Sequence, residues 1–210
     1  MDIGGAYGRY AYPLSKIVKN GKIISFEPGT YSFLVLSCIK AMLGMKNVHI
    51  LKKALGKQNK KAFLISPIKK TGRVGYSLSY INDGIIHGAL YEEIEVTTID
   101  AFFRDSVLER LDFIKCDAEG SEMTIFHGGE ITIQRYRPIV LSEVDRGHLK
   151  RFGNTTGELE AFFRNICYMV YRLQNDRLLE VSKINRDANY FFIPAEKTSK
   201  LCHFSSAFVK

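Results

Sequence analysis

The chain alternates between two patterns of apolar residues, one with the spacing of a helix and one with that of a short buried strand. Apolar residues three or four apart predict helices after Gly8, near Thr30 or Ser32, from Thr98, from Glu122 and after Thr155. Short apolar runs predict strands at 23–26, 48–51, 113–116, 139–141, 168–171 and 190–193. This alternation, closed by two consecutive strands, predicts an α/β sandwich whose sheet is mostly parallel, with an antiparallel last strand.

Residues 57–95 interrupt the alternation. They contain short strand-like runs at 62–65 and 77–81, and a further run at 94–98 follows. We expect a single domain over residues 1–210, with an irregular insertion at about 57–95 and a C-terminal tail at 196–210.

A glycine-rich turn lies at the very start of the chain, in the run Asp2-Ile3-Gly4-Gly5-Ala6-Tyr7-Gly8. In such folds a buried strand of several residues precedes the turn, and here only Met1 precedes Asp2. We therefore expect a truncated first strand. We also expect either that the natural protein starts upstream or that this chain is less stable than an extended version.

Acidic residues follow or end four of the predicted strands, at Asp2, Glu27, Asp117 and Glu143. Ligands of parallel sheets bind at the carboxyl ends of the strands, so four acids at one edge suit a ligand that is rich in hydroxyls and partly cationic. The turn is not the dinucleotide pattern G-x-G-x-x-G, and no phosphate-loop lysine follows it. Both observations weaken a nicotinamide or nucleoside triphosphate interpretation.

The sequence resembles the FkbM-type S-adenosylmethionine-dependent methyltransferases from Asp2 to about Pro194. The resemblance is carried by 2–8, Phe26-Glu27-Pro28, Ala54-Leu55-Gly56, 96–100, 112–122, Arg137-Pro138-Ile139-Val140 and 189–192. The run Ile114-Lys115-Cys116-Asp117-Ala118-Glu119-Gly120-Ser121-Glu122 is the most specific of these. The resemblance implies a Rossmann-like methyltransferase fold with strand order 3-2-1-4-5-7-6, and methyl transfer to a hydroxyl of a small molecule, a glycan or a glycolipid.

The resemblance also implies a set of cofactor-binding residues. Asp2 and the turn Gly4, Gly5, Ala6, Tyr7 and Gly8 would hold the methionine part of S-adenosylmethionine. Glu27, followed by Pro28, would hold the ribose, and the matching positions Ala54 and Asp117 complete the set. An acid at the ribose has a reason of its own to be there, since a carboxylate accepts hydrogen bonds from both hydroxyls.

Methyl transfer to an alcohol needs a group that removes the hydroxyl proton. The candidates are Asp117, Glu119, Glu143, His127 and His148. Alternatively, Asp117, Glu119 and Glu143 could hold a divalent cation that acidifies the hydroxyl. Plainer roles compete: Glu119 and Glu122 as charges at a helix N-terminus, and His127 as a residue that ends a helix.

The net charge of +8 is concentrated in one segment, because residues 28–82 contain ten basic residues and no acid. The bland interpretation is a solvated lysine face. The sharper one is a surface facing away from the cofactor that meets an anionic acceptor, a membrane surface or RNA. Few aromatic residues are interleaved, so nucleic acid is the less favoured partner, and an RNA-directed methyltransferase stays an alternative.

The remaining features place the chain only broadly. No apolar run has the length of a membrane span and no signal segment is visible, which favours a cytoplasmic protein. The four cysteines lack metal-ligand spacing, and Cys38 and Cys116 are expected to be buried free thiols. A third alternative is a methyltransferase-like protein that binds a partner without catalysis. The sequence indicates neither the acceptor nor the oligomeric state.

Overall fold

The structure is a computed structural model that describes the backbone of residues 1–203 and the side chains of residues 1–199. Its main feature is an eight-stranded sheet in the order β11-β10-β12-β9-β8-β1-β2-β3. The strands are β1 (Asp2–Ile3), β2 (Ile23–Phe26), β3 (Val48–Leu51), β8 (Phe113–Cys116), β9 (Ile139–Val144), β10 (Tyr168–Gln174), β11 (Arg177–Glu180) and β12 (Ala188–Pro194). The first five in space, from β3 to β9, are parallel, and β12 is antiparallel to both its neighbours. The expected order 3-2-1-4-5-7-6 is confirmed, with β11 added at one edge.

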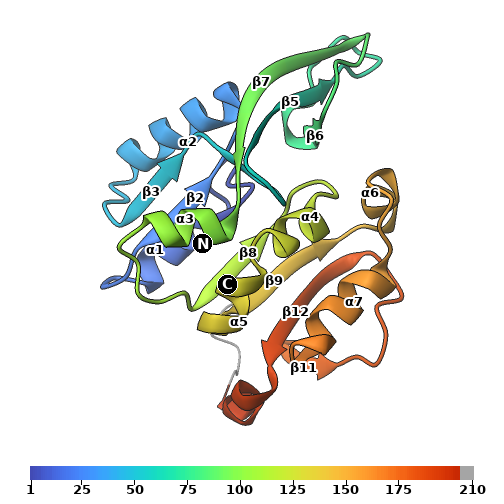
Figure 1. The fold of residues 1–210 in the computed structure, drawn as a ribbon. Helices are drawn as coiled ribbons and strands as arrows, with labels where there is room; N and C mark the ends of the chain where they lie inside the picture. The colour runs from blue at the N-terminus through green and yellow to red at the C-terminus, as the bar shows by residue number, and fades with distance from the viewer. Residues whose placement is uncertain (204–210) are drawn as a thin grey trace.

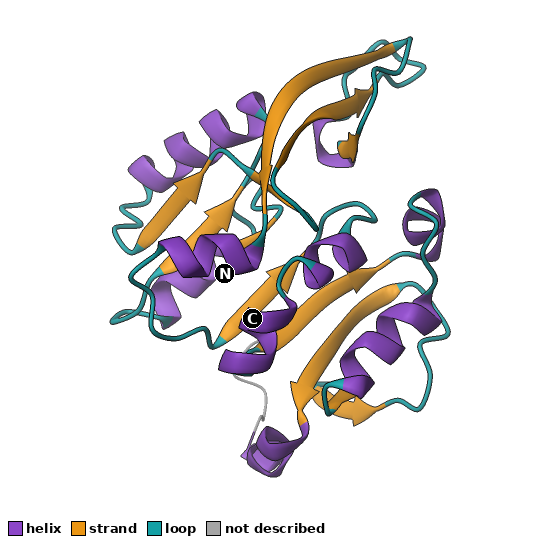
Figure 2. Ribbon diagram, viewed as in Figure 1, coloured by secondary structure: helices purple, strands orange, loops and turns teal. Residues whose placement is uncertain are grey.

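Helices cover both faces of this sheet (Figure 2). They are α1 (Ala11–Ile17), α2 (Thr30–Met42), α3 (Ile99–Asp105), α4 (Glu122–His127), α5 (Glu130–Tyr136), α6 (Arg146–Arg151) and α7 (Thr156–Asn165), and the 3-10 helix η2 (Ala195–His203) follows β12. Figure 1 shows α3, α4, α5 and α7 on the nearer face, with α1 and α2 behind. The predicted capping box is present, because Thr155 and Glu158 bond each other's backbone N–H groups at the start of α7.

The hydrophobic core lies between the sheet and the helices of the nearer face. Phe163 of α7 stacks on Phe192 of β12 with ring centroids 4.0 Å apart, and it also contacts Phe126 of α4. All three rings are fully buried. Of the two cysteines expected to be buried, Cys116 lies in this core, but Cys38 is exposed on α2, so that part of the prediction was wrong. The side chain of Cys202 lies outside the described part of the chain, as does the tail at 204–210.

The central strand β1 has only two residues, as the sequence predicted. Asp2 and Ile3 pair with Ser25 and Phe26 on one side and with Lys115 and Cys116 on the other. The amino group of Met1 is buried and donates to the carbonyl of Phe113 at 2.8 Å. Short as it is, β1 therefore holds the glycine turn at the centre of the carboxyl edge.

The segment that interrupts the alternation of helices and strands forms an ordered second sheet rather than an irregular insertion. Its order is β4-β7-β5-β6, built from β4 (Ala54–Leu55), β5 (Lys60–Pro67), β6 (Tyr80–Asn82) and β7 (Ala89–Thr97). The expected strand at 77–81 was wrong in its first half, because the 3-10 helix η1 (Tyr76–Leu78) precedes β6. Ala54, Ala62, Leu64, Ile94 and Val96 form a small core of its own. This sheet extends outward from the carboxyl edge of the large sheet (Figure 1).

Candidate functional site

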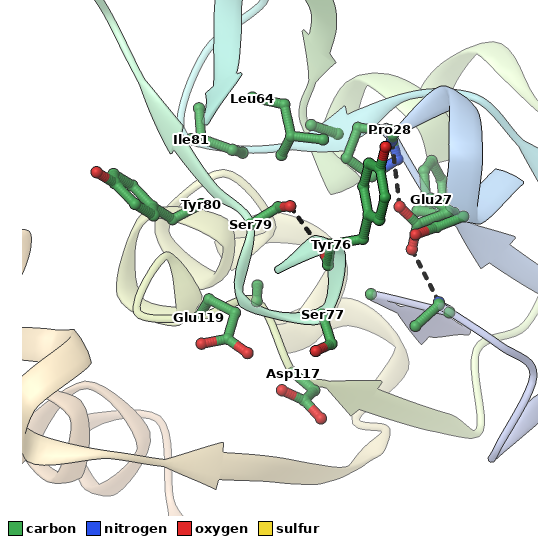
Figure 3. A pocket seen from close by; sticks show the side chains of 18 of the residues that line it. Glu27, Pro28, Leu64, Tyr76, Ser77, Ser79, Tyr80, Ile81, Asp117 and Glu119 are labelled. Carbon is green, nitrogen blue, oxygen red and sulfur yellow. Dashed lines mark hydrogen bonds between the residues drawn. The ribbon is translucent and has the colours of Figure 1, made fainter. Parts of the chain in front are cut away.

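A cavity of about 550 Å³ lies at the carboxyl ends of β1, β2, β8 and β9 and is roofed by the second sheet (Figure 3). Volumes of this size are typical of small-molecule sites. From the large sheet it is lined by Ile3, Gly4, Gly5, Ala6, Tyr7, Arg9, Tyr10, Phe26, Glu27, Pro28, Asp117, Ala118, Glu119 and Glu143. From the second sheet, η1 and the residue between η1 and β6 it is lined by Ala54, Leu55, Tyr76, Ser77, Ser79, Tyr80 and Ile81.

The glycine turn is folded tightly over the ends of β2 and β8. The N–H groups of Gly4 and Gly5 both donate to the carbonyl of Phe26, at 3.0 and 3.2 Å. Gly4 has φ +76°, and a Cβ on it would lie 1.9 Å from the carbonyl oxygen of Asp117. Only glycine fits this position, because both the conformation and the space exclude a side chain.

Glu27 lies at the end of β2 and is fixed by the backbone around it. Its two carboxylate oxygens accept from the N–H of Ala6 at 2.8 Å and of Gly29 at 3.1 Å. Burial raises the pKa of Glu27, and the two N–H bonds oppose that rise. The carboxylate faces the cavity with lone pairs to spare, as the ribose assignment requires.

Two residues of the expected cofactor set do not line the cavity. Asp2 is only 1% exposed and lies beneath the turn, with its carboxylate 3.4 Å from the hydroxyl of Ser25. Burial raises the pKa of Asp2, which the nearby amino group of Met1 and Lys115 counteract. Gly8 also lies outside the lining. The structure therefore places Asp2 beneath the turn, which it supports from behind.

Asp117 and Glu143 are brought together by the register of two neighbouring parallel strands. Cys116 of β8 pairs with Ser142 of β9, so the next residue of each strand reaches the same point of the edge. The two carboxyl groups share a hydrogen bond, which together with burial raises the pKa of Glu143 to about 8. Burial also acts to raise the pKa of Asp117, but the bond from Glu143 and the charge of Lys115 lower it overall. Near neutral pH the two carboxyl groups thus share one proton.

Lys115 is a buried cation beside this pair. It is 1% exposed, its Nζ lies 3.2 Å from a carboxylate oxygen of Asp117, and it lies 4.7 Å from the ring centroid of Tyr10. In the sequence, Lys115 stands out only as part of a motif. The signal that could have singled it out is a lone charge inside an otherwise apolar strand.

The loop after Asp117 is strained and held from below. Glu119 has φ +52° and Gly120 has φ +105°. Glu122, buried at the start of α4, accepts from the N–H groups of Ala118 at 2.9 Å and Gly120 at 3.3 Å. Glu119 pairs with Nδ1 of His148 at 3.1 Å, and burial raises its pKa. The geometry gives Glu122 a loop-holding role and keeps Glu119 at the rim of the cavity.

Two further expectations concern His127 and a metal site. His127 lies at the end of α4, packs edge-on against Phe162 at 5.2 Å and does not line the cavity, so it is not placed to act as the base. Within the described residues, no group of three or more His, Cys, Asp or Glu side chains is arranged to hold a metal ion. Asp117, Glu119 and Glu143 therefore do not fit a cation site, and Lys115 already brings positive charge to Asp117.

The second sheet is tied to the large sheet around the cavity. Tyr31 of α2 stacks on Tyr76 of η1 at 4.2 Å, and Arg151 of α6 lies 4.4 Å from the ring of Tyr80. The hydroxyl and N–H of Thr30 donate to Glu92 of β7. These contacts, and the serines of the roof, were missed because nothing in the sequence shows that the segment folds back over the carboxyl edge.

Four lysines of the basic segment form ion pairs near the end of the second sheet that joins the large sheet, which we call its base. Lys52, Lys53 and Lys61 pair with Glu92, Glu95 and Glu93 at 2.8–3.0 Å, and Lys60 pairs with Asp83. Lys53 also lines the cavity, so the expectation that the whole segment faces away from it was wrong. The acids lie just beyond the acid-free stretch of sequence. Antiparallel pairing of β5 with β7 brings Lys61 close to Glu93, and parallel pairing of β4 with β7 brings Lys53 close to Glu95.

A sheet of this order, with a glycine turn after its central strand and an acid ending the next strand, defines the Rossmann-like methyltransferase class. Residues 2–173 match the Methyltransferase FkbM domain. The chain belongs to the FkbM methyltransferase family.

A solved structure agrees with this fold. Methyltransferase FkbM from Methylobacillus flagellatus is similar with a TM-score of 0.57 and 16% identity, over 91% of this chain and 42% of that chain. A precorrin-6y C5,15-methyltransferase from Geobacter metallireducens gives a lower TM-score of 0.48 and 11% identity, over 91% of this chain and 76% of that chain. The chain thus spans less than half of the first of these proteins. No curated protein sequence matches the chain.

Proposed function

We propose that the chain is an S-adenosylmethionine-dependent O-methyltransferase whose acceptor is a small molecule or a glycan. The observation that carries this is the Asp117–Glu143 pair, which opens onto the same cavity as Glu27 and the glycine turn. An ionised acid that takes a proton and an acid that holds a ribose thus lie in one site. This is the arrangement that methyl transfer to a hydroxyl needs.

The residues of one half of the cavity fit the cofactor. Glu27 supplies a fixed carboxylate for the ribose hydroxyls, and the turn from Gly4 to Tyr7 leaves its backbone open to the cavity. Ala54 and Leu55 offer apolar surface at the other side of Glu27, which suits a purine ring. When bound, S-adenosylmethionine supplies a methyl group already attached to a good leaving group, so the protein has only to align the acceptor and remove its proton.

Asp117 is the proposed base. It is ionised at neutral pH because Lys115 and the proton of Glu143 both stabilise its negative charge. An acceptor hydroxyl hydrogen-bonded to Asp117 would pass its proton to the Asp117–Glu143 pair when its oxygen takes up the methyl group. The two carboxyl groups together would then hold two protons in place of one.

The roof of the cavity is the proposed acceptor side. Figure 3 shows Ser77 over Asp117, with Tyr76, Ser79 and Tyr80 beside it on the same segment. Hydroxyl groups of this kind bond other hydroxyls, and tyrosine rings offer flat apolar faces. Both properties suit an acceptor rich in hydroxyl groups.

The cofactor assignment is tested by calorimetry with S-adenosylmethionine. Glu27→Ala should weaken binding about ten-fold or more, because a charge-assisted hydrogen bond is lost. Glu93→Ala is the matched control, since Glu93 lies on the second sheet, pairs with Lys61 and does not line the cavity. Equal affinity of both variants and the parent would contradict the assignment.

The base assignment is tested by turnover on a panel of hydroxylated acceptors, followed by transfer of a labelled methyl group. Asp117→Asn should lower turnover about 100-fold or more while cofactor affinity stays nearly unchanged. Parent-like turnover of the variant would refute Asp117 as the base. Loss of the parent's activity on adding a chelator would refute the metal-free form of the proposal.

A further inference from the structure

Two loop segments lie at the end of the second sheet that is remote from the large sheet. The register pairs Pro67 of β5 with Ala89 of β7, so the loop at 68–75, which follows Pro67, and the last of the residues 84–88, which lead from β6 back to Ala89, approach the same end. Figure 1 shows this end extending away from the body of the molecule. We call these two segments, 68–75 and 84–88, the arm tip.

The arm tip differs in charge from the base of the same sheet. At the base, four lysines are paired with acids of the second sheet and its loops. At the arm tip, Lys69, Lys70 and Arg73 are exposed, and no ion pair involves them within the described residues. The arm tip contains no acid, and Asp83, which precedes its second segment, is already paired with Lys60 of the base. The tip thus presents three uncompensated positive charges.

Exposed isoleucines accompany these charges. Ile68 is 49% exposed, Ile85 48% and Ile86 37%, although isoleucine is among the residues most often buried. The segments 68–75 and 84–88 contain no Phe, Tyr or Trp. Single-stranded nucleic acid is bound with the help of stacking rings, so these segments do not suit it.

We propose that the arm tip docks on a membrane surface that carries anionic lipid headgroups. Basic residues are attracted to such a surface within a Debye length, and aliphatic side chains between them enter the boundary of the acyl region. A protein partner would be expected to meet an apolar patch of low charge, and the three cations at the tip are complementary to anionic headgroups instead. The inference depends on the tip alone and not on the proposed methyl transfer.

Docking at the tip has a consequence for the cavity. Leu90 and Tyr91 of β7 directly follow the tip, are about half exposed and line the cavity as well. The chain therefore runs from the proposed membrane contact straight into the wall of the site. An acceptor attached to a lipid would be met at the surface where the arm is docked.

The test is sedimentation of the full chain with vesicles, one set of pure phosphatidylcholine and one with an equal amount of phosphatidylglycerol. We expect binding only to the anionic vesicles. The variant Lys69→Ser, Lys70→Ser, Arg73→Ser should bind about 100-fold more weakly, since each basic residue near the surface contributes about five-fold. The control Lys19→Ser, Lys22→Ser, Lys46→Ser removes the same charge from exposed positions elsewhere and should bind nearly like the parent.

A second variant, Ile68→Ser, Ile85→Ser, Ile86→Ser, separates insertion of the apolar side chains from electrostatic attraction to the headgroups. Raised salt screens the attraction, so the binding that the parent keeps at raised salt should be lost in this variant. Unaltered cofactor affinity and melting temperature show that each variant is folded. Equal losses in the tip and control lysine variants would overturn the proposal, as would no binding of the parent. Self-association that the isoleucine variant abolishes, or RNA binding without vesicle binding, would likewise overturn it.

Discussion

Replacing Glu143 by glutamine should stabilise the protein, and the gain should grow with pH. The neutral amide in Glu143→Gln mimics the protonated carboxyl that donates to Asp117, so the hydrogen bond is kept while the ionisation is removed. In the parent, the bond to Asp117 and burial raise the pKa of Glu143 from 4.5 to about 8. The folded state therefore holds a proton between these pH values that the unfolded chain has released.

The direction and size of this change in stability follow from the linkage between proton binding and folding. A raised folded pKa contributes stability that is complete below pH 4.5 and is lost as pH rises through about 8. At 1.36 kcal/mol per pH unit, the full difference is about 5 kcal/mol as an upper bound. Glu143 is only half buried, so solvent screening reduces the expected gain to about 1–2 kcal/mol at pH 8 and above.

The assay is urea denaturation of the parent and Glu143→Gln at a series of pH values from 4 to 9, about one unit apart. The difference in unfolding free energy should be near zero at the acid end, rise through neutrality and level off above about pH 8. Glu109→Gln, at an exposed position without an ion pair in the described residues, is the control and should show no such rise. Parallel curves for parent and Glu143→Gln would refute the shared proton.

Other substitutions test the scaffold around the pair. Gly4→Ala should cost about 3 kcal/mol or more in thermal unfolding and weaken cofactor binding, because the added Cβ meets the Asp117 carbonyl. Lys115→Met should cost about 3 kcal/mol, since it leaves Asp117 without its buried partner. It should also move the acid limb of the turnover profile to higher pH, whereas an unchanged profile would show that Lys115 does not tune the pair. Phe163→Ala should cost about 3–5 kcal/mol in urea denaturation, and a loss below about 1 kcal/mol would contradict its place in the core.

Local sequence patterns were sufficient for the parallel strands of the large sheet and for the glycine turn. The runs Ile23–Phe26, Val48–Leu51 and Phe113–Cys116 were predicted with the observed bounds. Each is a short, mostly apolar run that is followed by an acid or another polar residue. The residues of the run and its neighbours therefore indicate both the burial of the strand and the position where it ends. The strand β11 was missed, although the residues Asn175 and Asp176, both with positive φ, make the tight hairpin turn that precedes it.

Which residues line the cavity was harder to predict from the sequence. The sequence placed Asp117, Glu119 and Glu143 near one another, because the ends of parallel strands share an edge. It could not show that Asp2 lies beneath the turn or that His127 faces away from the cavity. Which side of an element a residue occupies depends on how that element packs, and the spacing of residues within it does not contain that information.

What the sequence alone determined is the order of strands and helices, the family, and the acids at the strand ends, because these depend on short-range patterns and motifs. What only the tertiary structure decided is which charges meet. The folding of the second sheet neutralises four lysines with acids that lie 23 to 42 residues away, and it leaves three basic residues of the arm tip without an ion pair in the part of the chain that the structure describes. The pairing of β8 with β9 makes one proton common to Asp117 and Glu143. Electrostatic energy depends on distance in space, and long-range register sets that distance.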